Sequence, residues 1–207
     1  MSNADVKKIN SLNSVPYYQA NAQDFFDTTI RYDLSQITTL FLSYLSKGSK
    51  ILDAGCGSGR DSKYFLTKGY DVVAFDGAQK LAELASKFTG LSVYHRYFSQ
   101  MDEEQEYDGI WTSASLLHMP KTELFGTLEK LKKALKPKGA WYMSFRYGHG
   151  DHKEGDRYFY DQTEESLTKI LEQLGGITIL HMSVPDNLKS RRGFKFLVCI
   201  VRKDERK

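Results

Sequence analysis

The sequence predicts an α/β fold in which a mostly parallel sheet is covered by helices on both faces. Short apolar, strand-like runs alternate along the chain with amphipathic helical stretches, which is typical of βαβ units. A glycine-rich loop joins the first strand of the series to the helix that follows it. Only a turn-rich segment separates the last two strands, so these two are expected to pair antiparallel.

The alternation can be followed residue by residue. No strand pattern precedes residue 50, and residues 24–44 are expected to form one or two helices. Strands are expected at residues 50–54, 71–76, 91–95, 107–112, 140–145, 177–184 and 194–201. Helices are expected at residues 60–68, 78–88, 122–135 and 163–174. The glycine-rich segment between Arg146 and Arg157 is interpreted as a solvated loop.

Length and composition indicate an ordinary globular protein. The 207 residues are enough for one domain with a full core, and 41% of them are hydrophobic and 27% charged. No run of 18 apolar residues predicts a membrane span, and the N-terminus lacks the pattern of a signal peptide. Residues 1–15 are expected to be a flexible N-terminus or tag, and residues 16–207 a single domain with an N-terminal helical lid.

The two cysteines and the distribution of charge carry less information. Cys56 and Cys199 are isolated in the sequence, which argues against a disulfide framework or a zinc site and favours a cytoplasmic location. The net charge is +3, but the stretch from Asp186 to the C-terminus carries +5 and the remainder −2. This basic end is interpreted first as a solvated surface and second as a contact for an anionic substrate.

The loop at residues 53–59, Asp-Ala-Gly-Cys-Gly-Ser-Gly, is the most informative stretch. Its glycines allow a tight turn and close approach of the backbone to a ligand. Their spacing is Gly-x-Gly-x-Gly, and Arg60 stands where a dinucleotide-binding loop would carry its third glycine. The carboxylate of Asp53 would repel a pyrophosphate but tolerate a ligand with an ammonium group and no phosphate. S-adenosylmethionine (SAM) is such a ligand, so Asp53 and Arg60 argue against a nicotinamide-dependent oxidoreductase.

An acid at the end of the second strand supports a nucleoside ligand. Asp76 follows Asp53 by 23 residues, and an acid at this place can accept hydrogen bonds from both ribose hydroxyls. This role would be the same for SAM and for NAD. The alternative is that Asp76 only caps the next helix.

The glycine loop, Asp76 and residues 107–118 together resemble class I SAM-dependent methyltransferases. The stretch Leu-Lys-Pro-Lys-Gly at residues 135–139 also resembles that family, and within it the chain is similar to small bacterial methyltransferases of the type 11 and tellurite-resistance-like groups. The resemblance implies a Rossmann-like seven-stranded sheet of order 3-2-1-4-5-7-6 with strand 7 antiparallel. It also implies SAM as cofactor and S-adenosylhomocysteine as product.

The resemblance further implies which residues contact the cofactor. Asp53 and the loop would hold the methionine moiety, Asp76 the ribose, and residues after the third strand the adenine, where relatives often have an acid or amide. A tyrosine-rich N-terminal segment would either close over the cofactor as a lid or form a helix that packs its aromatic rings on the sheet. The residues implied are Tyr17, Tyr18, Asn21, Asp53, Gly55, Cys56, Gly57, Gly59, Asp76, Gly77, Ala78, Phe98, Ser99, Thr112, Ser113 and Leu116.

The acceptor side is less determined. His118 follows the fourth strand and is either a general base or a residue that shapes the pocket. Candidate substrate contacts are Arg146, Tyr147, His149, Arg157 and Arg191. No metal is expected, because the acids and histidines at residues 149–156 match no zinc spacing.

The predicted activity is in-line transfer of a methyl group from SAM to a small-molecule acceptor. A tRNA or protein acceptor, or a SAM-binding module without catalysis, are the alternatives. The chain lacks an Asn/Asp-Pro-Pro-aromatic motif, which disfavours methylation of exocyclic amines on DNA bases. The sequence predicts no membrane partner and leaves the oligomeric state open.

Overall fold

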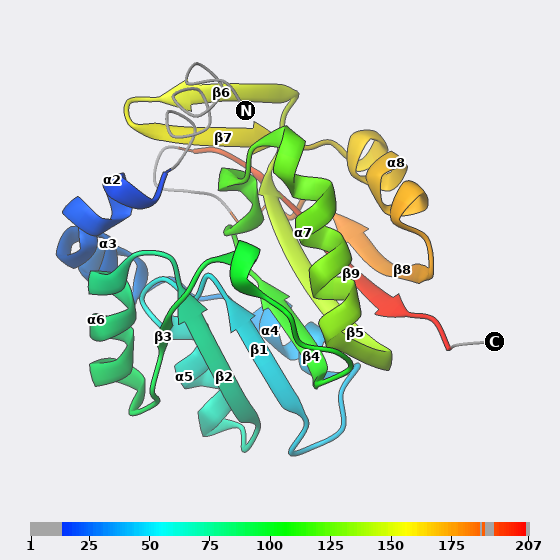
Figure 1. Cartoon of the computed structure of the whole chain (residues 1–207), viewed down its shortest axis with the longest axis horizontal. Coiled ribbons are helices and arrows are strands. Elements are labelled where there is room, and N and C mark those ends of the chain that lie inside the picture. Colours follow the sequence, from blue (N-terminus) through cyan, green and yellow to red (C-terminus); the bar gives the residue numbers. More distant parts are fainter. Residues whose placement is uncertain (1–13, 187, 189–192, 206–207) are drawn as a thin grey trace.

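The strands of the structure form one large sheet and one hairpin. The computed structural model describes residues 14–186, 188 and 193–205. Its strands are β1 (Lys50–Ala54), β2 (Asp71–Asp76), β3 (Tyr94–His95), β4 (Tyr107–Thr112), β5 (Leu135–Arg146), β6 (Gly150–Glu154), β7 (Arg157–Asp161), β8 (Ile177–Ser183) and β9 (Phe196–Lys203). The seven-stranded sheet has the order β3-β2-β1-β4-β5-β9-β8, and β6 pairs with β7 apart from it (Figure 1).

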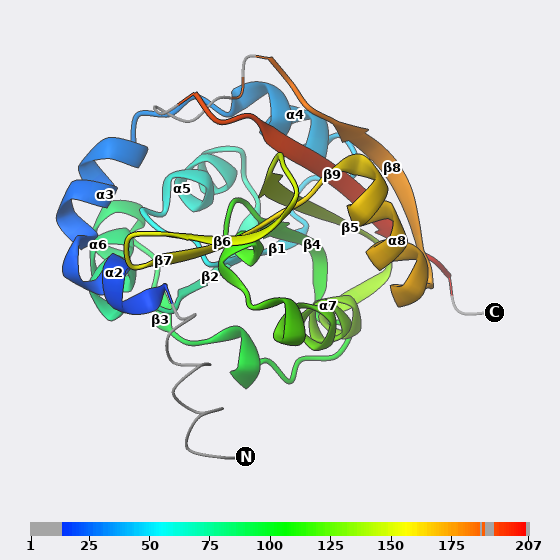
Figure 2. The ribbon, with the colours of Figure 1, turned by 90° about the horizontal axis from the view of Figure 1, so that it is seen from above.

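Helices lie on both faces of this sheet. They are α2 (Val15–Ala20), α3 (Ala22–Thr29), α4 (Ser35–Leu42), α5 (Arg60–Thr67), α6 (Gln79–Thr89), α7 (Lys121–Ala134) and α8 (Glu164–Leu174), with short 3₁₀ turns η1 (Phe98–Gln100) and η2 (Leu116–His118). Figure 2 shows α4 and α5 on one side of the sheet and α7 and α8 on the other.

The strand order confirms the expected topology. Strands β1 to β5 pair in parallel, and β9 is antiparallel to both of its neighbours, β5 and β8. Counted within the large sheet alone, this is the order 3-2-1-4-5-7-6 with the last strand antiparallel. Two strand starts differ from the expectation by more than two residues. The third strand is only two residues long, and β5 begins at Leu135 rather than Ala140. An irregular register between Tyr107 and Gly109 accommodates Pro137, which has no amide hydrogen for a ladder.

Side chains alternate across the central strands and so build two cores. Along β5, Trp141 and Met143 pack toward the leucines of α7 and α8. Tyr142 points to the opposite face, where its ring stacks on Trp111 of β4 at 3.7 Å between centroids and faces the helices α4 and α5. This alternation follows from the two-residue period of a strand. It also places Tyr142, Ser144 and Arg146 on one face.

Two expectations about the chain outside the sheet are wrong. The segment after β5 is not a loop but the hairpin β6–β7, turned at Gly155 with φ +58° and anchored by buried Tyr158 and Phe159. Its many glycines and charged residues concealed the strand pattern. Ser14 and Val15 were expected in a flexible N-terminus, but Val15 begins α2, and Ser14 is buried and accepts a hydrogen bond from the Tyr158 amide at 2.9 Å. Among the described residues, no helix is both long and apolar enough to cross a bilayer.

Candidate cofactor and acceptor site

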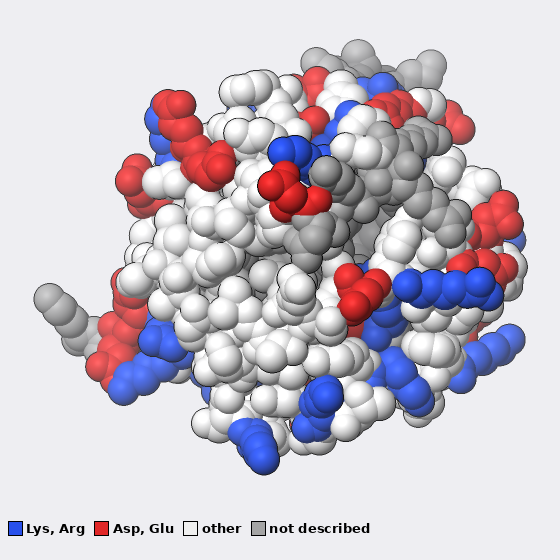
Figure 3. Space-filling view, turned by 180° about the vertical axis from the view of Figure 1, so that it is seen from behind, with Lys and Arg blue, Asp and Glu red and all other residues white. Residues whose placement is uncertain are grey.

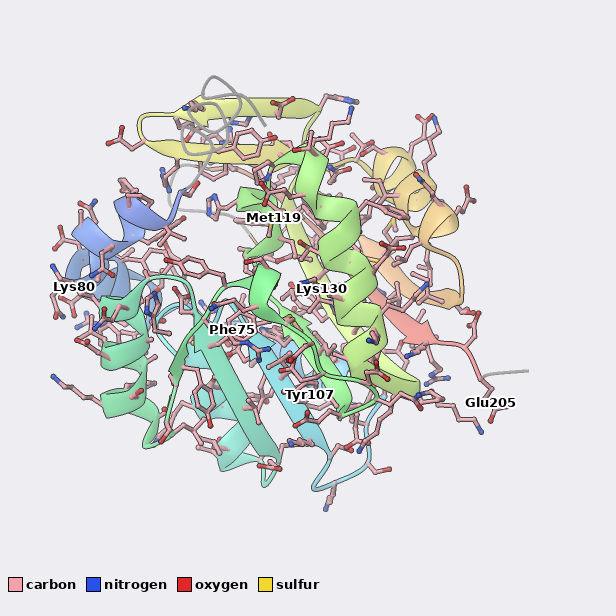
Figure 4. All side chains as sticks on the ribbon, in the orientation of Figure 1. Phe75, Lys80, Tyr107, Met119, Lys130 and Glu205 are labelled. Atoms are coloured by element: carbon pink, nitrogen blue, oxygen red, sulfur yellow. The ribbon has the colours of Figure 1, made fainter. Side chains whose placement is uncertain are left out.

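A cavity of about 860 Å³ lies where the parallel strands end. Its wall is built by the loops after β1, β2 and β4, by the N-terminal helices and by the β6–β7 hairpin. In the view from above, the hairpin crosses over the central strands, and α2 and α3 lie to one side of them, next to α6 (Figure 2). Figure 4 labels two lining residues, Phe75 at the end of β2 and Met119 below the hairpin. The cavity is at the place where open α/β sheets bind ligands.

The glycine loop has a backbone that only glycine adopts readily. Gly55 and Gly57 have φ values of +78° and +56°, in the left-handed region. The amides of Gly55 and Cys56 both donate to the Phe75 carbonyl, at 2.9 and 3.0 Å, and so fasten the loop to the end of β2. A Cβ at Gly55 would lie 2.5 Å from the Cβ of Ser115. The loop is therefore a closely packed floor of the cavity.

Asp76 braces the start of α6 and the glycine loop, and its place in the cavity is compatible with the ribose role predicted for it. Its Oδ1 accepts from the Ala78 amide at 2.8 Å, at the start of α6, and its Oδ2 accepts from the Gly57 amide at 2.9 Å. Burial raises the pKa of Asp76. The carboxylate lines the cavity, and its two oxygens offer about four acceptor positions, of which these amides use two. It can brace the loop and still accept from the hydroxyls of a ribose.

Asp53 is a buried carboxyl group with few neighbours that would stabilise its negative charge. Its side chain is 2% exposed, and its Oδ2 accepts from the Ser62 hydroxyl at 2.6 Å. Burial, with the nearby charge of Asp61, raises the pKa of Asp53 to about 7. A cation bound nearby would favour the ionised form of this carboxyl group.

The arginines next to the loop are already held by carboxylates. Arg60 forms a two-point ion pair with Asp61, with Nε–Oδ1 and Nη2–Oδ2 distances of 2.7 and 2.8 Å, and Trp111 Nε1 also donates to Asp61. Arg96 is paired with Glu103. Both arginines line the cavity. This part of the wall therefore suits a cationic nucleoside better than a pyrophosphate.

Helix α2 closes the cavity through a hydrogen-bonded chain. The Tyr18 hydroxyl lies 2.7 Å from His118 Nε2, and His118 Nδ1 lies 2.7 Å from the Tyr158 carbonyl. Since a carbonyl only accepts, Nδ1 carries the proton and Tyr18 donates to Nε2. Burial lowers the pKa of His118 to about 4, so the ring is neutral at pH 7. In this arrangement His118 joins the lid to the hairpin, and its role as a base stays a prediction.

The hairpin contributes a cluster of charged side chains to the opposite wall. Arg146 pairs with Glu154 at 2.5 Å and lies 3.5 Å from the ring centroid of Phe194. Arg146, Glu154 and Arg157 line the cavity. Nowhere in residues 14–186, 188 and 193–205 do three or more histidine, cysteine or acidic side chains come together as a possible metal site.

The structure brings most of the predicted cofactor residues to this cavity. Those that line it are Tyr17, Asn21, Asp53, Gly55, Cys56, Gly57, Asp76, Gly77, Phe98, Ser99 and Ser113, together with His118, Arg146 and Arg157. Those that do not line it are Gly59, Ala78, Thr112, Leu116, Tyr147 and His149.

Three of the residues away from the cavity, Gly59, Leu116 and Thr112, have structural roles instead. Gly59 approaches α6 so closely that a Cβ there would lie 2.9 Å from Thr89. Leu116 belongs to the core, and the Thr112 hydroxyl donates to the Tyr142 carbonyl. Tyr147 is 41% exposed. Arg191 lies outside the described residues.

Sequence reasoning missed several lining residues, among them Tyr142, Ser144 and Phe159. The signal for the first two was present in the alternation along β5, which places them on the same face as the predicted Arg146. The hydroxyl of Tyr142 is buried and has no hydrogen-bond partner among the described residues. Phe159 had no usable signal, because its segment was interpreted as a loop.

Known proteins share this architecture. Residues 51–139 match a family model described as a methyltransferase domain. A ubiquinone biosynthesis O-methyltransferase of Rickettsia akari is 26% identical over 120 residues, covering 56% of this chain and 47% of the relative. The chain thus spans about half the length of that curated relative.

Solved structures extend the comparison to the whole chain. The 1,6-didemethyltoxoflavin-N1-methyltransferase of Burkholderia thailandensis, solved with 1,6-didemethyltoxoflavin and S-adenosylhomocysteine, superposes with a TM-score of 0.77 at 22% identity, over 99% of this chain and 92% of that one. The [4+2]-cyclase SpnF superposes at 0.72 with 16% identity, over 94% and 96%. At these identities the likeness establishes the fold.

The strand order and the cavity at the carboxyl ends of the strands define a Rossmann-like α/β protein with a nucleoside-type site. Residues 51–139, which are less than half of the chain, match the methyltransferase-domain model, and the fold of the whole chain is that of class I methyltransferases, whose cofactor is SAM. Both findings agree with the resemblance to class I methyltransferases that the glycine loop indicated, whereas the type 11 and tellurite-resistance-like grouping stays a prediction.

Proposed function

We propose that this protein transfers the methyl group of SAM to a small-molecule acceptor inside the cavity. The proposal rests on one observation. Gly57, Asp76 and Asp53 all line that cavity, and the Gly57 amide donates to the Asp76 carboxylate. Asp76 would accept from the ribose hydroxyls, and Asp53 would stabilise the positive charge of the methionine moiety. Phe98 and Ser99, from the turn after β3, would border the adenine.

When bound, SAM supplies an electrophilic methyl group on a sulfonium. Transfer breaks the sulfur–methyl bond and forms a bond from methyl to an oxygen, nitrogen, sulfur or carbon of the acceptor, which loses a proton, while S-adenosylhomocysteine leaves. The protein's part is to align the two partners and exclude water. Helix α2 and the hairpin, joined through Tyr18 and His118, provide the enclosure. The polar groups that line this cavity include the Tyr142 hydroxyl, which would be available to orient the acceptor.

A small acceptor is favoured over RNA or protein by the cover over the cavity. A volume of about 860 Å³ lies within the range of small-molecule sites. The Rickettsia and Burkholderia relatives are named for small acceptors as well. On the face shown in Figure 3, Lys and Arg side chains are interspersed with Asp and Glu, as on an ordinary solvated surface.

Calorimetric titration with SAM, S-adenosylhomocysteine and NADPH tests the cofactor. We expect SAM and S-adenosylhomocysteine to bind and NADPH not to bind. Binding of NADPH without SAM would contradict the proposal. Release of S-adenosylhomocysteine in the presence of small phenols, amines and thiols then tests transfer, whereas SAM binding with turnover only on tRNA or protein would replace the small-molecule acceptor.

A further inference from the structure

Arg157 is the least compensated cation of the acceptor wall. Its guanidinium centre lies 4.9 Å from the ring centroid of Tyr17 and 5.0 Å from that of Phe159. All three residues line the cavity. The Nε of Arg157 is buried and has no hydrogen-bond partner among the described residues. A guanidinium held between two rings, with a donor left over, presents an edge to a planar anion.

The neighbouring Arg146, by contrast, has two carboxylates close to its guanidinium. Arg146 has Glu154 at 2.5 Å and Asp161 at 3.6 Å. Arg157 shares the same Glu154, but at 3.9 Å, which is an ion pair too long for a hydrogen bond. Glu154 thus serves two arginines. The charge of Arg157 is incompletely neutralised in a partly desolvated place, where an additional anion is favourable.

The surroundings of Arg157 are aromatic. Phe159 also contacts the ring of His118, with 4.8 Å between centroids, and Phe194 lies under Arg146. The Tyr18 hydroxyl is close to Arg157 as well: burial raises the pKa of Tyr18 to about 12, while the guanidinium acts in the opposite direction. Rings that frame a cation favour a flat ligand that stacks while its acidic group pairs with the guanidinium.

We infer that the acceptor is a planar aromatic compound bearing an acidic group such as a carboxylate, and that Arg157 binds this group between Tyr17 and Phe159. The inference rests on the proposed function, because it concerns the acceptor half of the same cavity. Arg157 would therefore determine specificity, and it would hold the ring in place without contacting the reacting methyl.

The test compares benzoate with benzamide, which match in shape and differ in charge, on the full chain saturated with S-adenosylhomocysteine. We expect benzoate to bind at least about tenfold more tightly, as for a charge-assisted hydrogen bond to a partly buried arginine. Arg157→Gln should abolish this preference while leaving S-adenosylhomocysteine affinity unchanged, which also shows that the variant is folded. Lys153→Gln removes one positive charge from the exposed side of the same hairpin and should keep the preference.

Glu154→Gln should change the preference for benzoate in the direction opposite to that of Arg157→Gln. It removes the carboxylate that competes for Arg157, so the preference for benzoate should increase. Equal affinity for benzoate and benzamide, including no binding of either, overturns the inference, as does a preference that survives Arg157→Gln. If S-adenosylhomocysteine itself fails to bind the wild-type chain, the proposed function fails, and the inference fails with it. Binding of S-adenosylhomocysteine without an acid preference contradicts the inference alone.

Discussion

The two halves of the cavity are built in different ways. The cofactor half comes mainly from two short continuous segments, residues 53–61 and 75–78, and depends on backbone geometry and on the carboxyl groups of Asp53, which is buried, and Asp76, which is half-buried. The acceptor half is assembled from side chains of α2, the turn after β4, the strand β5 and the β6–β7 hairpin, which are far apart in the sequence. The first half is consequently determined by local sequence. The second half depends on tertiary packing, so its side chains can change while the fold is kept.

The largest expected effect is that of Gly55→Ala in the cofactor half. The added Cβ would lie 2.5 Å from Ser115 on a backbone with φ +78°, and the left-handed conformation alone costs roughly 1–2 kcal/mol. We expect affinity for S-adenosylhomocysteine to fall by about 100-fold or more, near 3 kcal/mol, measured by calorimetry. Gly126→Ala, in open space on α7, is the matched control and should leave binding unchanged. Tight binding by Gly55→Ala would show that the loop is not the floor of the site.

Asp76→Asn is expected to have the next largest effect. It keeps the shape of the side chain but removes the charge that accepts from the Gly57 amide and from a ribose. Loss of one or two charge-assisted hydrogen bonds predicts about 10- to 100-fold weaker binding of S-adenosylhomocysteine. Asp71→Asn, at the exposed opposite end of β2, is the control. Similar binding of S-adenosylhomocysteine by the two variants would contradict the role of Asp76 in binding the ribose.

The pH dependence of binding tests the role of Asp53. Burial is the main cause, and the charge of Asp61 the second, of the rise in the pKa of Asp53 to about 7. The carboxyl group of the free protein is therefore protonated at low pH. A bound cation favours the ionised form and lowers this pKa. Affinity for SAM should therefore rise with pH up to about 7, by at most about tenfold per pH unit, and level off above it. Titrations from pH 5.5 to 7.5 should show this slope in wild type and a weaker one in Asp53→Asn; an unchanged slope would remove Asp53 from the account.

Tyr18→Phe probes the acceptor half and should have the smallest effect on the cofactor. It removes the hydrogen bond that the lid donates to His118 Nε2. We expect a loss of about 1 kcal/mol in the free energy of unfolding, and S-adenosylhomocysteine affinity within about twofold of wild type. Turnover should fall more than affinity because the cover is loosened. A cofactor affinity as weak as that of Asp76→Asn would mean that the two halves are not separable.

The contrast also explains what sequence reasoning could predict. The order of the sheet followed from the alternation of strands and helices, and the floor of the site from the glycines and Asp76, because these signals are local. Gly59 and Leu116 were assigned to the cofactor from their place in the motif alone. Packing determines their position instead, since Gly59 lies against α6 and Leu116 in the core.

The hairpin shows the limit most clearly. Its strands contain glycines and charged residues that normally mark loops, and its stability comes from contacts of Tyr158 with Ser14 and His118, which are 144 and 40 residues away in the sequence. No local pattern encodes such contacts. The same holds for the contact of Arg157 with Tyr17, which comes from α2, whereas Phe159 is a local neighbour on the same face of β7.

A crystal structure of the protein with S-adenosylhomocysteine would test the central claim most directly. We predict the ribose hydroxyls on the Asp76 carboxylate, the amino acid moiety over the bend at Gly55 and Gly57, and the sulfur directed toward the chamber between Tyr18, His118 and Arg157. A nucleoside bound elsewhere, with this crevice unused, would contradict the account.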